Sequence, residues 1–258
     1  MALRLSKGLR NYVNEIGCLK QGLSGGRLLI YTGAQPAAAD DAVTGTLLCT
    51  FTDASGAHTA EVLATGSVAL TGGGSGSVNT LTVNGIEIMG SATSFNASLT
   101  QTAADIATKI NNNRKNLLFT AANNGSATVT LTARPGLGTL ANGWVVASTV
   151  TTITKTDTNM ASGVDAANGL IFGDSATGIL SKPTTQVWSG VAVATGTAGY
   201  FRFLGSVADA GALDSSEVFL RLDGNISTSG ANMNISNTTI TSGATQTIGT
   251  GTITEPAS

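Results

Sequence analysis

The sequence predicts a mainly β protein, built from a jelly-roll or sandwich-like β domain, an inserted small α+β module and an N-terminal helix. Glycine accounts for 33 of the 258 residues and aromatic residues for only 5%, a composition typical of many short strands and turns. Short apolar or alternating runs recur along most of the chain and end at Gly or Asn. Apolar residues at three- and four-residue spacing are confined to two segments, which predicts two helical regions.

The first helical region lies in residues 1–25, which we call the N-terminal helical arm. Its apolar residues follow the spacing of an amphipathic helix, with Ser6 as a suitable N-cap and Gly17 as a suitable stop. Such a helix can pack on its own domain, dock on a neighbouring subunit, or bind a membrane surface, and its short length and modest charge favour the first two. The predicted interaction residues are the apolar stripe and the adjoining basic residues: Leu9, Tyr12, Val13, Ile16, Arg4, Lys7 and Arg10.

The β domain is predicted to be split in the sequence into residues 26–70 and 157–258. Strands are expected at 27–31 and 46–52, where apolar runs end in Thr-Gly or Asp-Ala-Ser-Gly. In the second part, a turn at 196–199 and a strand at 200–204 are expected, followed by short strands to the end of the chain. Regularly spaced short strands of this kind favour a sandwich or jelly roll.

The inserted α+β module is predicted to span residues 71–156. The Gly/Ser-rich residues 71–77 have the composition of a flexible linker and are interpreted as a hinge. Asn84-Gly85 predicts a two-residue hairpin turn. The second helical region follows, with Thr102 and Asp105 in the spacing of a capping box, and it is expected to cover the module's sheet.

Charge and composition argue against several classes of protein. Lys plus Arg (13) nearly balances Asp plus Glu (15), and no basic run interleaved with aromatics occurs, so direct binding of nucleic acid is not expected. No run of 18 apolar residues is present, and the N-terminus lacks a signal-peptide core. We therefore expect no membrane association and assembly in a cytoplasm, with Cys18 and Cys49 free rather than paired.

The chain has few residues that could carry chemistry. His58 is the one histidine, and Ser55 lies in no nucleophile elbow. Three His and Cys residues are too few for a typical metal cluster, and the Gly-rich residues 71–77 lack the ending of a phosphate-binding loop. The sequence thus predicts no enzyme activity, no cofactor, and no catalytic or metal-binding residue.

A low charge combined with abundant Thr, Ser, Asn, Gly and Ala suits a subunit that contacts other proteins over much of its surface. Interface centres are depleted in charged residues, and unprotected strand edges invite pairing. A glycan-binding sandwich would share this composition but needs exposed aromatic rings, and the chain has twelve aromatic residues in all.

Two stretches resemble known families. Residues 26–36, together with the preceding helix and the Gly45–Leu48 segment, are similar to the N-terminal part of tailed-bacteriophage virion structural proteins. Residues 81–86 and 103–111 resemble the "IN" module of flagellins, filament caps and phage appendages. The resemblance implies a non-enzymatic virion protein that forms homo-oligomers and contacts the major capsid protein or tail proteins. A capsid decoration (cement) protein is favoured, and a tail, collar or fibre-base component or a glycan-binding appendage is the alternative.

Overall fold

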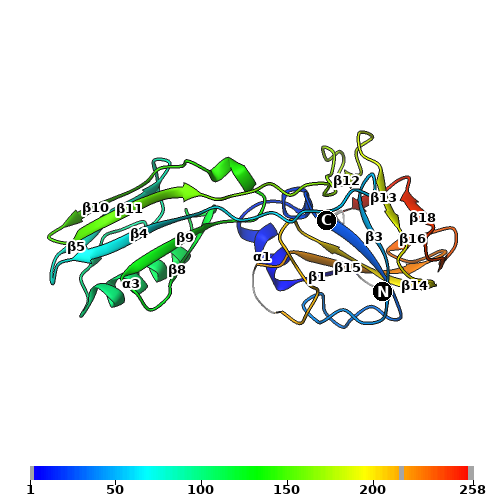
Figure 1. Cartoon of the computed structure of the whole chain (residues 1–258), viewed down its shortest axis with the longest axis horizontal. Coiled ribbons are helices and arrows are strands. Elements are labelled where there is room, and N and C mark those ends of the chain that lie inside the picture. Colours follow the sequence, from blue (N-terminus) through cyan, green and yellow to red (C-terminus); the bar gives the residue numbers. More distant parts are fainter. Residues whose placement is uncertain (1–2, 215–217, 255–258) are drawn as a thin grey trace. The chain divides into compact units, whose positions relative to one another are not determined.

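The structure, a computed structural model, describes residues 3–214 and 218–254 and is mainly β (Figure 1). The chain divides into two compact units, which we call unit 1 (Met1–Glu61 with Ala166–Ser258) and unit 2 (Val62–Asp165). The sheets are almost entirely antiparallel, which confirms the expected mainly β class and is consistent with a sandwich-like architecture. Within the described residues, no helix has the length and apolar character needed to cross a membrane.

Unit 1 is built on a nine-stranded sheet. Seven strands form a continuous path, β16 adds to β15 in parallel, β17 adds to β14, and β12 pairs separately with β19. In sheet order the path is β1 (Arg4–Leu5), β15 (Arg221–Ser227), β14 (Gly196–Leu204), β2 (Arg27–Thr32), β3 (Leu47–Asp53), β13 (Trp188–Val191) and β18 (Thr245–Ile248). The remaining strands are β16 (Met233–Asn234), β17 (Thr239–Ile240), β12 (Ile179–Ser181) and β19 (Thr252–Thr254).

Both faces of the central strands are buried. Leu28 and Ile30 of β2 contribute to the larger core of unit 1, whereas Leu29 and Tyr31, which alternate with them, belong to a smaller cluster on the opposite face. On that second face the rings of Tyr31 and Tyr200 stack with centroids 5.2 Å apart. A strand buried on both faces reads as a continuous apolar run, which explains the run at 27–31.

Charged side chains are buried on the same face as the tyrosine stack. Arg202 binds Asp223 in a bidentate pair at 2.8 and 2.7 Å, and Arg221 binds Asp209 likewise at 2.6 and 2.8 Å. Each arginine also donates to backbone carbonyls of the loops that cover this face, such as Asp41 O at 2.9 Å from Arg202 Nη1. Because buried charges require such partners, these pairs fix the covering loops on the sheet.

Two helices lie at the N-terminus of unit 1, α1 (Lys7–Glu15) and α2 (Leu19–Leu23). The Ser6 hydroxyl accepts a hydrogen bond from Leu9 N at 3.1 Å, so the predicted N-cap is confirmed. The helix ends at Glu15, before Gly17, whose N–H donates back to Tyr12 O at 2.9 Å.

Unit 2 contains two small sheets and one long helix, α3 (Leu99–Asn112), which packs on β8 and β9. Ala103, Ile106 and Ile110 of α3 are buried in the core of this unit. One sheet has the order β11 (Thr154–Ala161), β4 (Thr65–Gly72), β9 (Thr128–Ala133) and β8 (Phe119–Asn123). The other comprises β10 (Val146–Thr151), β5 (Ser77–Val83), β6 (Ile86–Glu87) and β7 (Thr93–Ser94), and a 3-10 turn covers Gly138–Ala141.

The hairpin predicted at Asn84-Gly85 is confirmed, since Val83 pairs with Ile86 and both turn residues have positive φ (50° and 80°). The predicted cap of α3 is wrong by one turn. Ser98, not Thr102, is the N-cap, and its hydroxyl accepts from Gln101 N at 3.1 Å.

The Gly-rich residues 71–77 connect β4 to β5 inside unit 2, so their interpretation as a hinge between modules is wrong. Gly76 has φ +101°, and a Cβ there would lie 1.9 Å from Thr151 O. The glycines therefore serve a close approach of two backbones. The module boundaries predicted after residues 70 and 156 fall within β4 and β11, which pair with each other, whereas the two units meet in sequence at 61/62 and 165/166.

Candidate interaction site

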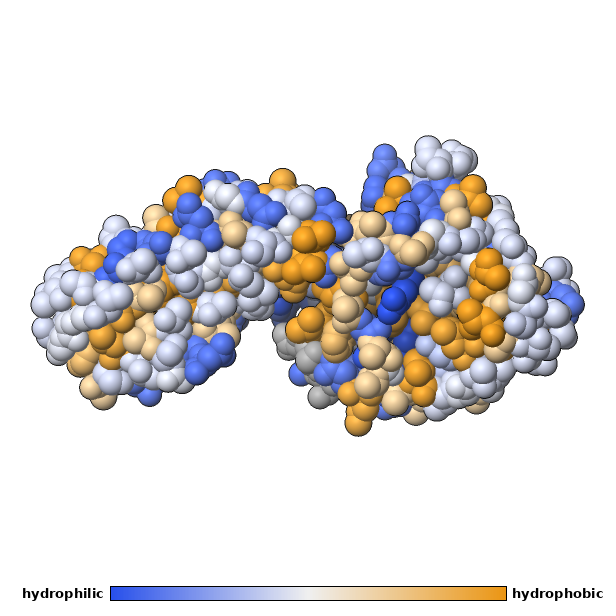
Figure 2. Space-filling view, in the orientation of Figure 1, coloured by the Kyte–Doolittle hydropathy of each residue, from blue (hydrophilic) through white to orange (hydrophobic). Residues whose placement is uncertain are grey.

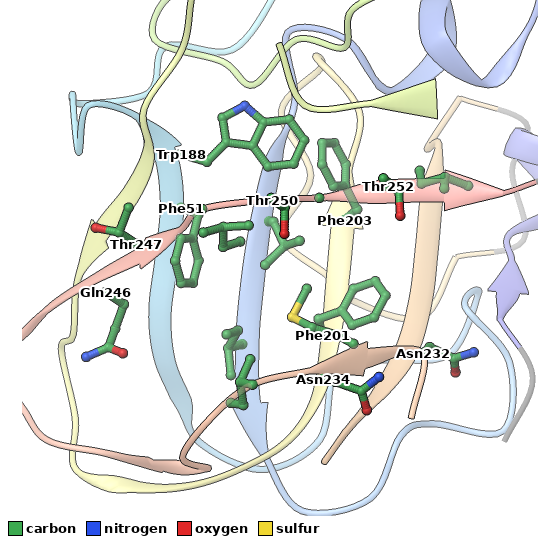
Figure 3. Close-up of a pocket in the computed structure, with 18 of the residues that line it drawn as sticks. Phe51, Trp188, Phe201, Phe203, Asn232, Asn234, Gln246, Thr247, Thr250 and Thr252 are labelled. Carbon is green, nitrogen blue, oxygen red and sulfur yellow. The ribbon is translucent and has the colours of Figure 1, made fainter. Parts of the chain in front are cut away.

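A cavity of about 640 Å³ lies in unit 1 between the central strands of the nine-stranded sheet and segments near the C-terminus (Figure 3). Its floor consists of apolar side chains from the larger core of unit 1. Its cover comes from two segments near the C-terminus, 232–237 and 246–253. Since protein interiors are close-packed, with few voids larger than a water molecule, a cavity of this size is the strongest candidate for a binding site in unit 1.

The floor residues come from neighbouring strands and share a face because side chains alternate along each strand. Ile30 of β2 pairs with Phe201 of β14, and Leu28 pairs with both Phe51 of β3 and Phe203 of β14. Figure 3 shows these aromatic rings and Trp188 gathered on the same side of the sheet.

Trp188 is held in a fixed orientation at one end of the floor. Its indole N–H donates to Gln186 Oε1 at 3.0 Å, and its ring meets Phe172 edge-on with centroids 5.2 Å apart. The Gln186 amide is also bound to the backbone, through Ile171 N and Gly169 O. The indole N–H is therefore already satisfied, and Trp188 offers a ligand apolar contact rather than a hydrogen bond.

The cover combines uncharged polar residues with the apolar side chains of Met233, Ile235, Ile248 and Ile253. Asn232 and Asn225 exchange hydrogen bonds between their amide oxygens and each other's backbone N–H, at 3.3 and 3.1 Å. Gly224 allows this close approach, because a Cβ there would lie 2.5 Å from the Phe201 ring and 2.9 Å from Asn232. The polar residues of the cover that line the cavity and are labelled in Figure 3 are Asn232, Asn234, Gln246, Thr247, Thr250 and Thr252.

The described lining residues include no charged side chain. Phe51, Trp188, Phe201 and Phe203 are each at most 6% exposed, so none presents an open ring face for stacking a sugar. Neutral amides and hydroxyls above an apolar floor can hold an uncharged chain segment through backbone hydrogen bonds and apolar contact. The geometry of this site suits binding rather than proton transfer.

The apolar stripe predicted in the N-terminal helical arm packs on unit 1 itself. Leu9 and Tyr12 are 0% and 2% exposed in the larger core of that unit, and Val13 and Ile16 are half-buried against it. The apolar stripe of α1 is thus covered by the core of unit 1 in the same chain. Docking of this face on a neighbour stays a prediction that would require α1 to leave its core.

The basic residues of the arm lie beside the loop at 36–40. Arg4, in β1, donates to Pro36 O, and Lys7 N donates to both carboxylate oxygens of Asp40 at 3.0 and 3.1 Å. Arg4 and Arg10 line a second, shallower cavity there, of about 380 Å³. None of these three residues lines the larger cavity.

His58 and Ser55, the residues considered for chemistry, do not line the cavity. His58 Nε2 lies 3.0 Å from Gly25 O, and burial lowers the pKa of its ring. Ser55 shares a hydrogen bond with the Ser189 hydroxyl at 2.8 Å. The described residues contain no cluster of three His, Cys, Asp or Glu side chains that could hold a metal.

Both cysteines are free, Cys18 at the surface and Cys49 buried. Burial raises the pKa of the Cys49 thiol to about 11.

Sequence reasoning missed the cavity because its floor residues read as ordinary core. A usable signal lies in its cover: from Asn225 to Thr254 the sequence contains no charged residue. In comparisons with known proteins, no family model, curated protein or solved structure matches this chain.

Proposed function

We propose that this chain is a non-enzymatic structural protein of a bacteriophage virion, a capsid decoration (cement) protein that stabilises the shell through contacts between subunits. Its partners would be the major capsid protein and further copies of itself. The observation that supports this most is the character of the surface, which combines few charges with exposed apolar side chains.

The exposed apolar residues occur in both units. Val191 and Val193 are 50% and 64% exposed on and just after β13, and Leu140 in unit 2 is 65% exposed. Figure 2 shows, on one face, hydrophobic residues lying among weakly polar ones. Surfaces of this kind lose little hydration free energy when another protein covers them, and interface centres are poor in charge.

Several of the few charged side chains are buried inside the molecule. Arg202, Arg221, Asp209, Asp223 and Glu61 are all buried, so the surface carries even less charge than the composition suggests. A decoration protein needs such neutral surfaces, because it must lie against many copies of its partners without charge repulsion.

The architecture is compatible with this role. We propose that unit 1 is a jelly-roll-like β domain that binds the shell and that the α+β unit is an insertion in it. The stretches at 26–36 and 81–86 that resemble phage virion and appendage proteins support the same reading.

The proposal is tested by counting the chain in purified virions of the phage that encodes it, by quantitative mass spectrometry against the major capsid protein. We expect a copy number in a fixed ratio to the shell lattice. A handful of copies per particle would favour the alternative of a tail, collar or fibre-base component. Absence from the virion would contradict both.

A glycan-binding appendage is the second alternative, and the aromatic floor and amide-rich cover of the cavity favour it. The near-complete burial of the rings weighs against it. A glycan array with the full chain separates the two, since specific binding that is lost in Trp188→Ala would support the glycan role.

A further inference from the structure

One outer edge of the nine-stranded sheet is formed by β18, Thr245–Ile248. This strand pairs with β13, and no other described strand pairs with it. Thr245 and Thr247 are exposed. An outer strand presents unpaired N–H and C=O groups, which are a template for another strand.

The register identifies which backbone groups are unpaired. Ala192 N donates to Ala244 O at 2.9 Å, and continuing that register pairs Gly190 with Gln246 and Trp188 with Ile248. In an antiparallel ladder, alternate residues direct both backbone groups to the same neighbour. The N–H and C=O groups of Thr245 and Thr247 therefore point away from β13.

Proteins usually protect such edges with charge, proline or very short strands. The opposite edge of the same sheet, β1, has two residues, one of which is Arg4. The outer strand β11 of unit 2 carries Lys155 and Asp157. In contrast, β18 has no charged residue and no proline, and it lies in a stretch of 30 uncharged residues, 225–254.

We propose that the β18 edge pairs with the β18 edge of a second copy of this chain, antiparallel and about a two-fold axis. In a two-fold pair, β18 of one copy lies against β18 of the other copy. A charge on this strand would therefore lie close to the same charge of the second copy. An uncharged strand avoids that repulsion. Each copy also supplies the complementary edge, because the outward groups of Thr245 and Thr247 satisfy those of the partner strand.

The exposed valines next to this edge extend the same surface. Val191 pairs with Thr245, and Val193 follows two residues later. A continuous sheet across two copies would place the two β13 strands, with these apolar side chains, on either side of the paired β18 strands, on one shared sheet surface.

The test is the self-association of the full chain, measured by sedimentation velocity over a concentration series up to about 1 mM, where a contact with a millimolar Kd is half-formed. Thr247→Lys places like charges across the two-fold axis, and we expect it to weaken association at least about tenfold. Thr247→Glu should do the same alone, and an equimolar mixture of the two variants should recover association. The matched control is Thr156→Lys in β11, which should associate as the unaltered chain does.

Three results would overturn the inference: an unaltered chain that stays monomeric throughout, association that Thr247→Lys leaves intact, or equal weakening by Thr156→Lys. Far-UV circular dichroism of each variant checks that the fold persists, and recovery in the mixture is itself inconsistent with an unfolded variant. The inference names a surface for the contact between copies that the proposed function includes, and it fails separately from it, because incorporation into virions does not require this edge.

Discussion

Arg202 and Asp223 are both 0% exposed and satisfy each other with two hydrogen bonds. We predict that Asp223→Asn destabilises the protein by about 3–5 kcal/mol, because it leaves the Arg202 guanidinium buried without a counter-charge. The double variant Arg202→Met with Asp223→Leu should lose much less, since it removes both charges. Urea unfolding curves measure both, and an equal loss in the single and double variants would contradict this account of the pair.

His58 makes the free energy of unfolding depend on pH. Its pKa in the folded protein lies below the ordinary 6.5, chiefly through burial and also through Arg27 nearby, and its Nδ1 is buried with no hydrogen-bond partner. As pH falls below about 6.5, the unfolded chain binds a proton that the folded chain resists, so stability decreases. We predict that this decrease between pH 7 and 5 is absent in His58→Gln. Unfolding curves that fall in parallel for both proteins would refute the prediction.

At this scale the sequence predicts local features better than distant partners. Ser6 is predictable as the N-cap because it lies three residues before Leu9, the first residue of the apolar stripe, and the structure confirms it. The buried ion pair joins residues 21 positions apart on adjacent strands, which no local pattern encodes. The prediction of Thr102 as the cap of α3 is wrong because Thr102 lies inside the helix. There its hydroxyl donates a hydrogen bond to Ser98 O, as threonine commonly does.

At the scale of elements, the connection between β4 and β5 distinguishes packing from flexibility. We predict that Gly76→Ala destabilises unit 2 by about 1–3 kcal/mol, because the residue needs a positive φ and its Cβ would strike Thr151 O. Gly74→Ala, with nothing within 4 Å of its Cβ, should be neutral or slightly stabilising. Thermal unfolding of the two variants checks this, and equal stabilities would restore the hinge interpretation.

Helix α1 is expected to behave as part of the core of unit 1. Leu9 is fully buried, so Leu9→Ala should cost about 2–5 kcal/mol. Asn14→Ala, at an exposed position of the same helix, serves as the control and should change stability little. A detachable arm would instead tolerate Leu9→Ala without loss, as judged by the denaturant midpoint.

Strands with strong local signals were predictable, and strands defined by their neighbours were not. The runs at 27–31 and 46–52 correspond to β2 and β3 within one residue at each end. The turn expected at 196–199 is instead the first half of β14. There Gly199 accommodates the backbone of Gly33, whose carbonyl oxygen would lie 1.8 Å from an added Cβ, a constraint visible only once the sheet is formed.

At the scale of the whole molecule, the mainly β class was predictable from composition because turn-forming and β-favouring residues dominate it. The sheet order was not, since β14 pairs with β2 and β15 pairs with β1, in each case across most of the chain length. The cavity is likewise a product of tertiary packing: its floor comes from strands near both ends of the sequence and its cover from a stretch that contains no motif.

We propose that this protein works by contact between protein surfaces, as a decoration protein of a phage shell. The most direct measurement is the heat stability of phage shells assembled without the chain and then supplied with it in purified form, followed by the release of packaged DNA during a temperature ramp. We predict that shells lacking the chain release DNA at a lower temperature and that the added chain binds them and restores the original release temperature. Shells that are equally stable with and without it, or that fail to bind it, would contradict the account.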